Sequence, residues 1–87
     1  MARTGADLEE LAQLSAALLQ QSRTIEQVTA AVRGKLANTT WHGPAAERFR
    51  SAWSSDFEPS LHRLQAALQD AGMEVDRRRD ALFQAGG

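Results

Sequence analysis

Apolar side chains recur at steps of three and four residues through two long stretches of the chain, one on each side of residues 38–44. In the first stretch they form a heptad-like row from Leu8 to Leu36, and a second row runs beside it from Leu14 to Val32. This period is typical of an amphipathic α-helix, and the two rows make its apolar stripe wider than one neighbour would cover. We therefore expect a helix over about residues 7–38 that contacts two other helices.

Three small polar residues, Ser15, Ser22 and Thr29, recur every seven positions on the first row. Small side chains there would let another backbone come close, but an equally good interpretation is that these are merely tolerated polar positions. At the start of the helix, Asp7 with Glu10 three positions later resembles a capping box, which satisfies exposed backbone amides.

Residues 39–43 carry the chemistry of a turn. Asn and Thr favour turns, Gly43 adds backbone freedom, and Pro44 suits the first position of a helix because no hydrogen bond is lost there. We expect a second helix over about residues 44–83, with Gly43 as its N-cap. Trp41 precedes this start, and one interpretation is that its indole closes the open end of a helical hairpin.

The second helix contains an irregular step. Trp53, Phe57 and Leu61 follow one another at two steps of four, and Pro59 lies within this interval. Because proline cannot donate to the carbonyl four residues earlier, we expect a kink or local loosening near Ser55. The alternative is a true break that gives three helices. The second helix is also the longer one, so residues after about Asp76 should extend beyond the hairpin.

The predicted fold is all-α: one domain, an antiparallel helix-turn-helix hairpin. A hairpin of 87 residues has a seam rather than an enclosed core, and it leaves apolar surface in water. Pairing two hairpins into a four-helix bundle would remove this exposure, so we predict a dimer. The residues expected in the core or the dimer interface are Leu11, Leu18, Ile25, Val32, Phe49, Trp53, Phe57, Leu61, Leu64 and Leu68.

Composition and charge exclude several classes of function. The net charge of -1 gives no basic excess for nucleic acid or anionic lipid, and no apolar segment is long enough for a membrane span. Nucleic acid is therefore not expected as a partner, and a membrane is an unlikely one. The chain has no cysteine, and the first residues lack the apolar stretch of a cleaved secretory signal.

No constellation of catalytic residues or metal ligands stands out. His42 and His62 are the only histidines, and neither has carboxylates or thiols at metal-ligand spacing. No phosphate-binding glycine loop and no set of nucleophile, base and orienting group occurs. We expect no enzyme activity, no metal and no cofactor.

Trp41-His42-Gly43 forms a W-x-G tripeptide between two predicted helices, followed by Ala45-Ala46, Phe49 and Trp53. In these features and in its length the chain resembles the WXG100 family, the small ESAT-6-like proteins. The resemblance implies a hairpin that pairs, as homodimer or heterodimer, into an antiparallel four-helix bundle. It also implies synthesis in the cytoplasm of a Gram-positive bacterium and secretion through the type VII (ESX) system. Trp41 would then pack across the mouth of the hairpin, and Gly43 would allow the close turn.

One feature of that family is missing. Its export signal commonly places a tyrosine four positions before an acidic residue, just beyond the second helix, and this chain has no tyrosine. The chain is then the half of a heterodimer that lacks the signal, a truncated form, or a protein recognised through another surface; we favour the first. Arg77, Arg78 and Arg79 could contact the partner's tail or the secretion ATPase, although a solvated helix end is the simpler interpretation.

Two other functions compete with secretion as a pairing module. One is an intracellular helical scaffold or assembly subunit whose W-x-G is accidental. The other is membrane disruption after secretion, against which the neutral charge and the lack of a continuous apolar segment both argue.

Overall fold

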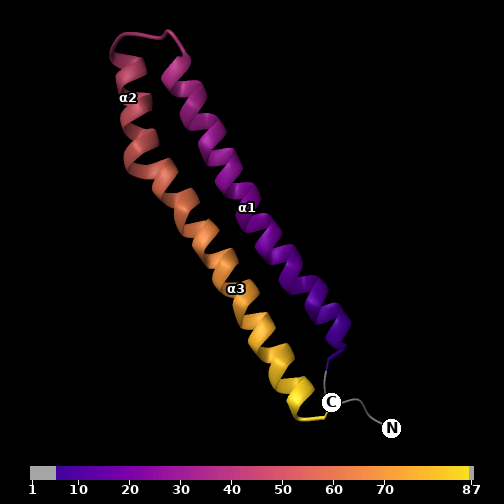
Figure 1. Cartoon of the computed structure of the whole chain (residues 1–87). Helices are drawn as coiled ribbons and strands as arrows, with labels where there is room; N and C mark the ends of the chain where they lie inside the picture. The colour runs from indigo at the N-terminus through magenta and orange to yellow at the C-terminus, as the bar shows by residue number, and fades with distance from the viewer. Residues whose placement is uncertain (1–5, 87) are drawn as a thin grey trace.

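The computed structural model describes residues 6–86 and folds them into one antiparallel helical hairpin (Figure 1). Helix α1 spans Leu8–Asn38. After the turn, α2 (Pro44–Ala52), a π-helical turn (Trp53–Phe57) and α3 (Glu58–Gln84) follow one another without interruption. No strand occurs among the described residues, so the predicted all-α hairpin is confirmed.

Both helix starts follow from local chemistry. One carboxylate oxygen of Asp7 accepts hydrogen bonds from the backbone N–H groups of Glu9 (2.9 Å) and Glu10 (3.0 Å), as expected of an N-cap. Gly43 precedes Pro44 with φ 109° and ψ 176°, a conformation that is essentially restricted to glycine. The predicted roles of Asp7, Gly43 and Pro44 are confirmed.

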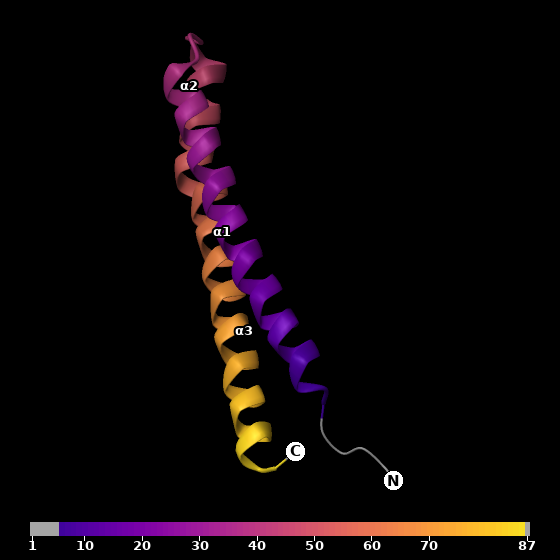
Figure 2. The same cartoon turned by 45° about the vertical axis from the view of Figure 1, so that its right-hand side comes forward.

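The hairpin is long and thin, with extents of 67 × 18 × 18 Å; its two helices run side by side in Figure 1 and overlap in the turned view of Figure 2. Two hydroxyls of α1 bond to backbone carbonyls of α3: Ser15 Oγ donates to Gly72 O (3.1 Å) and Ser22 Oγ to Gln65 O (3.0 Å). Thr29, the next residue in this heptad series, is also buried. The small polar residues therefore mark the line of contact between the helices, which we call the seam.

Gly72 lets the helices come close. A Cβ atom at this position would lie 2.9 Å from Leu19 Cγ and 3.3 Å from the carbonyl oxygen of Ser15. Both distances are shorter than ordinary van der Waals contacts, so only glycine fits without displacing its neighbours. The Ser15 hydroxyl reaches a backbone carbonyl because this side chain is missing.

The loosening expected near Ser55 occurs as the π-helical turn. The backbone N–H of Glu58 donates to the carbonyl of Trp53, five residues earlier, and Pro59 has no N–H to offer Ser55. The backbone stays in the right-handed helical region at Ala52, Phe57 and Glu58, so the alternative of a true break is wrong.

The seam also shows where α3 extends past the first residue of α1. Continuing the spacing of seven from the pairs Ser15–Gly72 and Ser22–Gln65 brings Leu8, the first residue of α1, level with Arg79. Residues 80–84 of α3 therefore extend beyond α1, about one turn later than the sequence predicts (Figure 1).

Candidate interaction surface

One side of the hairpin is apolar along both helices. On α1, a residue three positions after a seam residue lies on the apolar side of the hairpin, and a residue four positions after it lies on the opposite side. On α3, the residues three positions after Gln65 and Gly72 likewise lie to one side of the seam. Because the two helices are antiparallel, the residues at plus three on α1 and at plus three on α3 lie on the same side of the hairpin. This surface, which we call the apolar face, comprises Leu11, Leu14, Leu18, Ile25, Val28, Val32, Phe49, Phe57, Leu61, Leu64, Leu68 and Val75.

The apolar face is poorly covered. Among the described hydrophobic residues, only Ala46 is buried. Five large side chains of the apolar face are 41–48% exposed: Leu14, Val28, Phe49, Phe57 and Leu64. The other members of the face are half-buried between the helices. Contiguous exposed apolar surface of this kind marks an interaction site in soluble proteins.

Near the turn the apolar face is hollowed. An open hollow of about 460 Å³ lies between α1 and α2, and its lining consists of Ala31, Val32, Lys35, Leu36, Thr39 and Phe49. Its lining is almost entirely carbon, and Lys35 supplies the one charge at its edge. The hollow could receive an apolar side chain of a partner.

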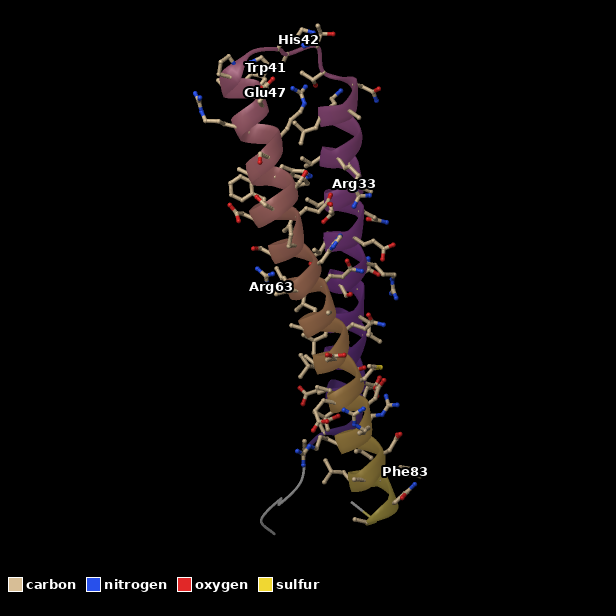
Figure 3. The ribbon with its side chains drawn as sticks, turned by 90° about the vertical axis from the view of Figure 1, so that its left-hand side faces the viewer. Arg33, Trp41, His42, Glu47, Arg63 and Phe83 are labelled. Carbon is tan, nitrogen blue, oxygen red and sulfur yellow. The ribbon has the colours of Figure 1, made fainter. Side chains whose placement is uncertain are left out.

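A row of three aromatic rings continues the apolar face to the turn. The ring centroids of Trp41 and Phe49 are 5.9 Å apart, and those of Phe49 and Phe57 are 6.4 Å apart, both in tilted arrangements. Trp41 stays 40% exposed and lies beside the first turn of α2, next to His42 at the tip of the turn (Figure 3). The indole thus rests on Phe49 rather than being enclosed in a core.

Arg50, which the sequence did not suggest, spans the turn. Its guanidinium donates to the carbonyl oxygens of Trp41 (2.7 Å), Thr39 (3.1 Å) and Leu36 (3.5 Å). Leu36 lies in the last turn of α1, where carbonyls attract cations, and Thr39 and Trp41 lie in the turn that follows, so Arg50 ties α2 to the end of α1 and to the turn.

The opposite side of the hairpin is polar and carries the main contact between charged groups of the two helices. Oε1 of Glu58 accepts from Arg33 Nε (2.8 Å) and from the indole Nε1 of Trp53 (3.2 Å). Arg33 belongs to α1, Glu58 to α3 and Trp53 to the π-helical turn, so one oxygen joins three elements. The hydrogen bond from Arg33 is the main reason that the pKa of Glu58 lies below its ordinary value.

The three arginines near the end of α3 are neighbours of carboxylates. Arg77 and Arg78 each reach Glu74 at 2.8 Å, while Arg79 lies 3.7 Å from Asp76 and 3.8 Å from Asp80. The hydrogen bond from Arg77, followed by that from Arg78, lowers the pKa of Glu74. The positive charge of this run is thus offset locally, and its predicted contact with a partner stays a prediction.

Across residues 6–86 no three His, Asp or Glu side chains gather as metal ligands would. No helix in that range combines the length and apolar character that crossing a membrane requires.

Of the ten predicted core or interface residues, seven are half-buried against the other helix, while Phe49, Phe57 and Leu64 are exposed on the apolar face. Trp53 differs from the rest, because its indole turns toward Glu58 on the polar side. Arg33, Arg50, Glu58 and Gly72 were missed. Gly72 is a glycine inside a predicted helix, which could have suggested a close approach of another backbone there, but long polar side chains carry no such signal.

Comparison with known proteins adds no relative. No protein-family model matches the chain, and searches of curated proteins and of solved structures return no significant match.

Proposed function

We propose that this chain is a pairing module: a WXG100-like, non-enzymatic helical hairpin that binds a second hairpin through its apolar face and is exported with it by a type VII secretion system. The observation that carries the pairing is the apolar face itself, which runs along both helices and leaves five of its large side chains 41–48% exposed. The export rests on the W-x-G turn between two helices.

The distribution of charge favours one way of pairing. The turn half of the hairpin, residues 23–64, has six Lys or Arg and four Asp or Glu, a net charge of +2. The tail half, residues 6–22 and 65–86, has three arginines and seven carboxylates, a net charge of -4. Two copies laid antiparallel on their apolar faces bring opposite charges together, whereas a parallel pair would juxtapose like charges.

Sedimentation equilibrium of the full chain tests the pairing. We expect a helical species of twice the chain mass, and its dissociation should become easier as salt is raised because screening weakens the contacts between the two halves. A folded monomer at all concentrations would exclude self-pairing and leave a related hairpin as the partner.

Export needs a separate test in a Gram-positive host. We expect the chain to reach the culture medium only when the type VII ATPase is active and, if it lacks its own signal, only when a related hairpin is co-expressed. If the chain stays in the cell when the type VII ATPase is active, with and without a co-expressed related hairpin, the alternative of an intracellular scaffold is favoured.

A further inference from the structure

The spacing of contact residues changes at the π-helical turn. In α3 the seam repeats every seven residues, from Gly72 to Gln65, and an unbroken α-helix would continue it through Glu58 to Ser51. Instead, Ser51 is exposed, Ala46 is the fully buried residue of α2, and the guanidinium of Arg50 reaches the carbonyl oxygen of Leu36 in α1. The contact positions therefore run Glu58, Trp53, Arg50 and Ala46, with a step of five across the π-helical turn.

This step of five rotates α2. One extra residue in a turn changes the direction of every residue before it by about 100° relative to α3. Without it, Phe49 would point away from α1, and the row of Trp41, Phe49 and Phe57 would not join the apolar face. The hollow at Val32 and Leu36 would lose the wall that Phe49 supplies.

One side chain links the π-helical turn to α1. Oε1 of Glu58 accepts from Trp53, five residues earlier, and from Arg33. The same two residues, five positions apart, are also joined by the π-helical hydrogen bond from the backbone N–H of Glu58 to the carbonyl of Trp53. We infer that Glu58 is a positioning residue for partner binding: with Arg33 and Trp53 it holds the π-helical turn, and so it sets the rotation of α2 that completes the apolar face.

This inference rests on the proposed pairing function but concerns a different side of the molecule. Arg33 and Glu58 lie on the polar side, where they do not touch a partner bound to the apolar face. Side chains at 56% and 21% exposure form an ion pair that contributes little by itself, so the effect on binding comes from geometry rather than from the attraction of the two charges.

The test compares Glu58→Ala and Glu58→Gln with Glu74→Ala in the full-length chain. Glu74 is the matched control because its carboxylate also contacts two side chains, Arg77 and Arg78, but both lie within α3. Sedimentation equilibrium measures the dissociation constant of self-pairing, and nuclear Overhauser effects between Trp41 and Phe49, and between Ala46 and α1, report the rotation of α2.

For Glu58→Ala we expect the nuclear Overhauser effects of both kinds, Trp41 with Phe49 and Ala46 with α1, to weaken. The dissociation constant of self-pairing should rise at least about tenfold, against less than about twofold for Glu74→Ala. Glu58→Gln keeps an oxygen for the indole N–H, and its effect should be smaller; it carries the test if Glu58→Ala does not fold. Unchanged contacts together with unchanged affinity would overturn the inference, and so would a loss of affinity with the contacts intact. If the unmodified chain is monomeric, the proposed self-pairing fails, and the contacts alone decide the role of Glu58.

Discussion

The two halves of the hairpin are held together by different means. In the tail half, small residues let the backbones approach, and hydroxyls of Ser15 and Ser22 bond directly to carbonyls of α3. In the turn half, long side chains bridge the helices: Arg50 reaches three carbonyls, and Glu58 joins Arg33 to Trp53. Close packing tolerates little change in volume, whereas bridging by exposed polar groups is sensitive to charge. The tail half should therefore respond to size, and the turn half to charge.

The largest effect should come from added volume in the tail half. Gly72→Val places atoms where Leu19 and the Ser15 carbonyl now lie, and overpacking of this kind costs about 1–3 kcal/mol. Chemical denaturation of the full chain, with circular dichroism as the signal, measures the loss.

Gly34→Ala is the matched control, since a Cβ atom at Gly34 would meet nothing within 4 Å. There the higher helix propensity of alanine should stabilise the chain by about 0.5–1 kcal/mol. If both substitutions stabilise, the helices are not as closely packed at Gly72 as the structure indicates.

In the turn half, Arg50→Ala should cost about 1–2 kcal/mol, less than the sum of three bonds because water replaces them in part. Arg48→Ala is the control: Arg48 is exposed on the same helix and makes no hydrogen bond or ion pair with the described residues. Equal unfolding free energies for the two variants would show that Arg50 does not hold the turn.

Trp41→Ala should have a smaller effect on folding, about 1 kcal/mol, because a 40% exposed indole loses one aromatic contact rather than a core position. A cost of 3–5 kcal/mol, typical of a buried aromatic residue, would mean that Trp41 is enclosed. We expect the same variant to weaken pairing more than it weakens folding, which separate denaturation and sedimentation experiments distinguish.

Acid should release the Glu58 contact with α1. The pKa of Glu58 in the folded chain is below the ordinary value of 4.5. Such a carboxyl stabilises the fold above its unfolded pKa, and that contribution is lost as the pH falls through the folded value. The stability difference between the unmodified chain and Glu58→Gln should therefore be largest at neutral pH and vanish in acid.

Glu74 sharpens this comparison, because hydrogen bonds from Arg77 and Arg78 lower its pKa as well. The stability difference between the unmodified chain and Glu74→Gln should depend on pH with the same sign. Only Glu58→Gln should change the fluorescence of Trp53, because only Glu58 contacts its indole. A parallel fluorescence change in both variants would mean that the indole does not report the contact with Glu58.

The helices and the turn could be read from the sequence because their causes are local. Asp7 caps the residues that directly follow it, and the conformations allowed to Gly43 and Pro44 depend on their own covalent structure. Pro59 likewise acts on the carbonyls immediately before it, which is why a disturbance near Ser55 was predictable.

Which side of each helix is covered was decided only in the tertiary structure. The sequence shows a broad apolar stripe, but the seam follows Ser15, Ser22 and Thr29 because Gly72 lets the helices approach there. The π-helical turn then rotates α2, so that Ala46 and Arg50 face α1 instead of Ser51. These outcomes depend on atoms far apart in the chain, and no local preference encodes where they meet.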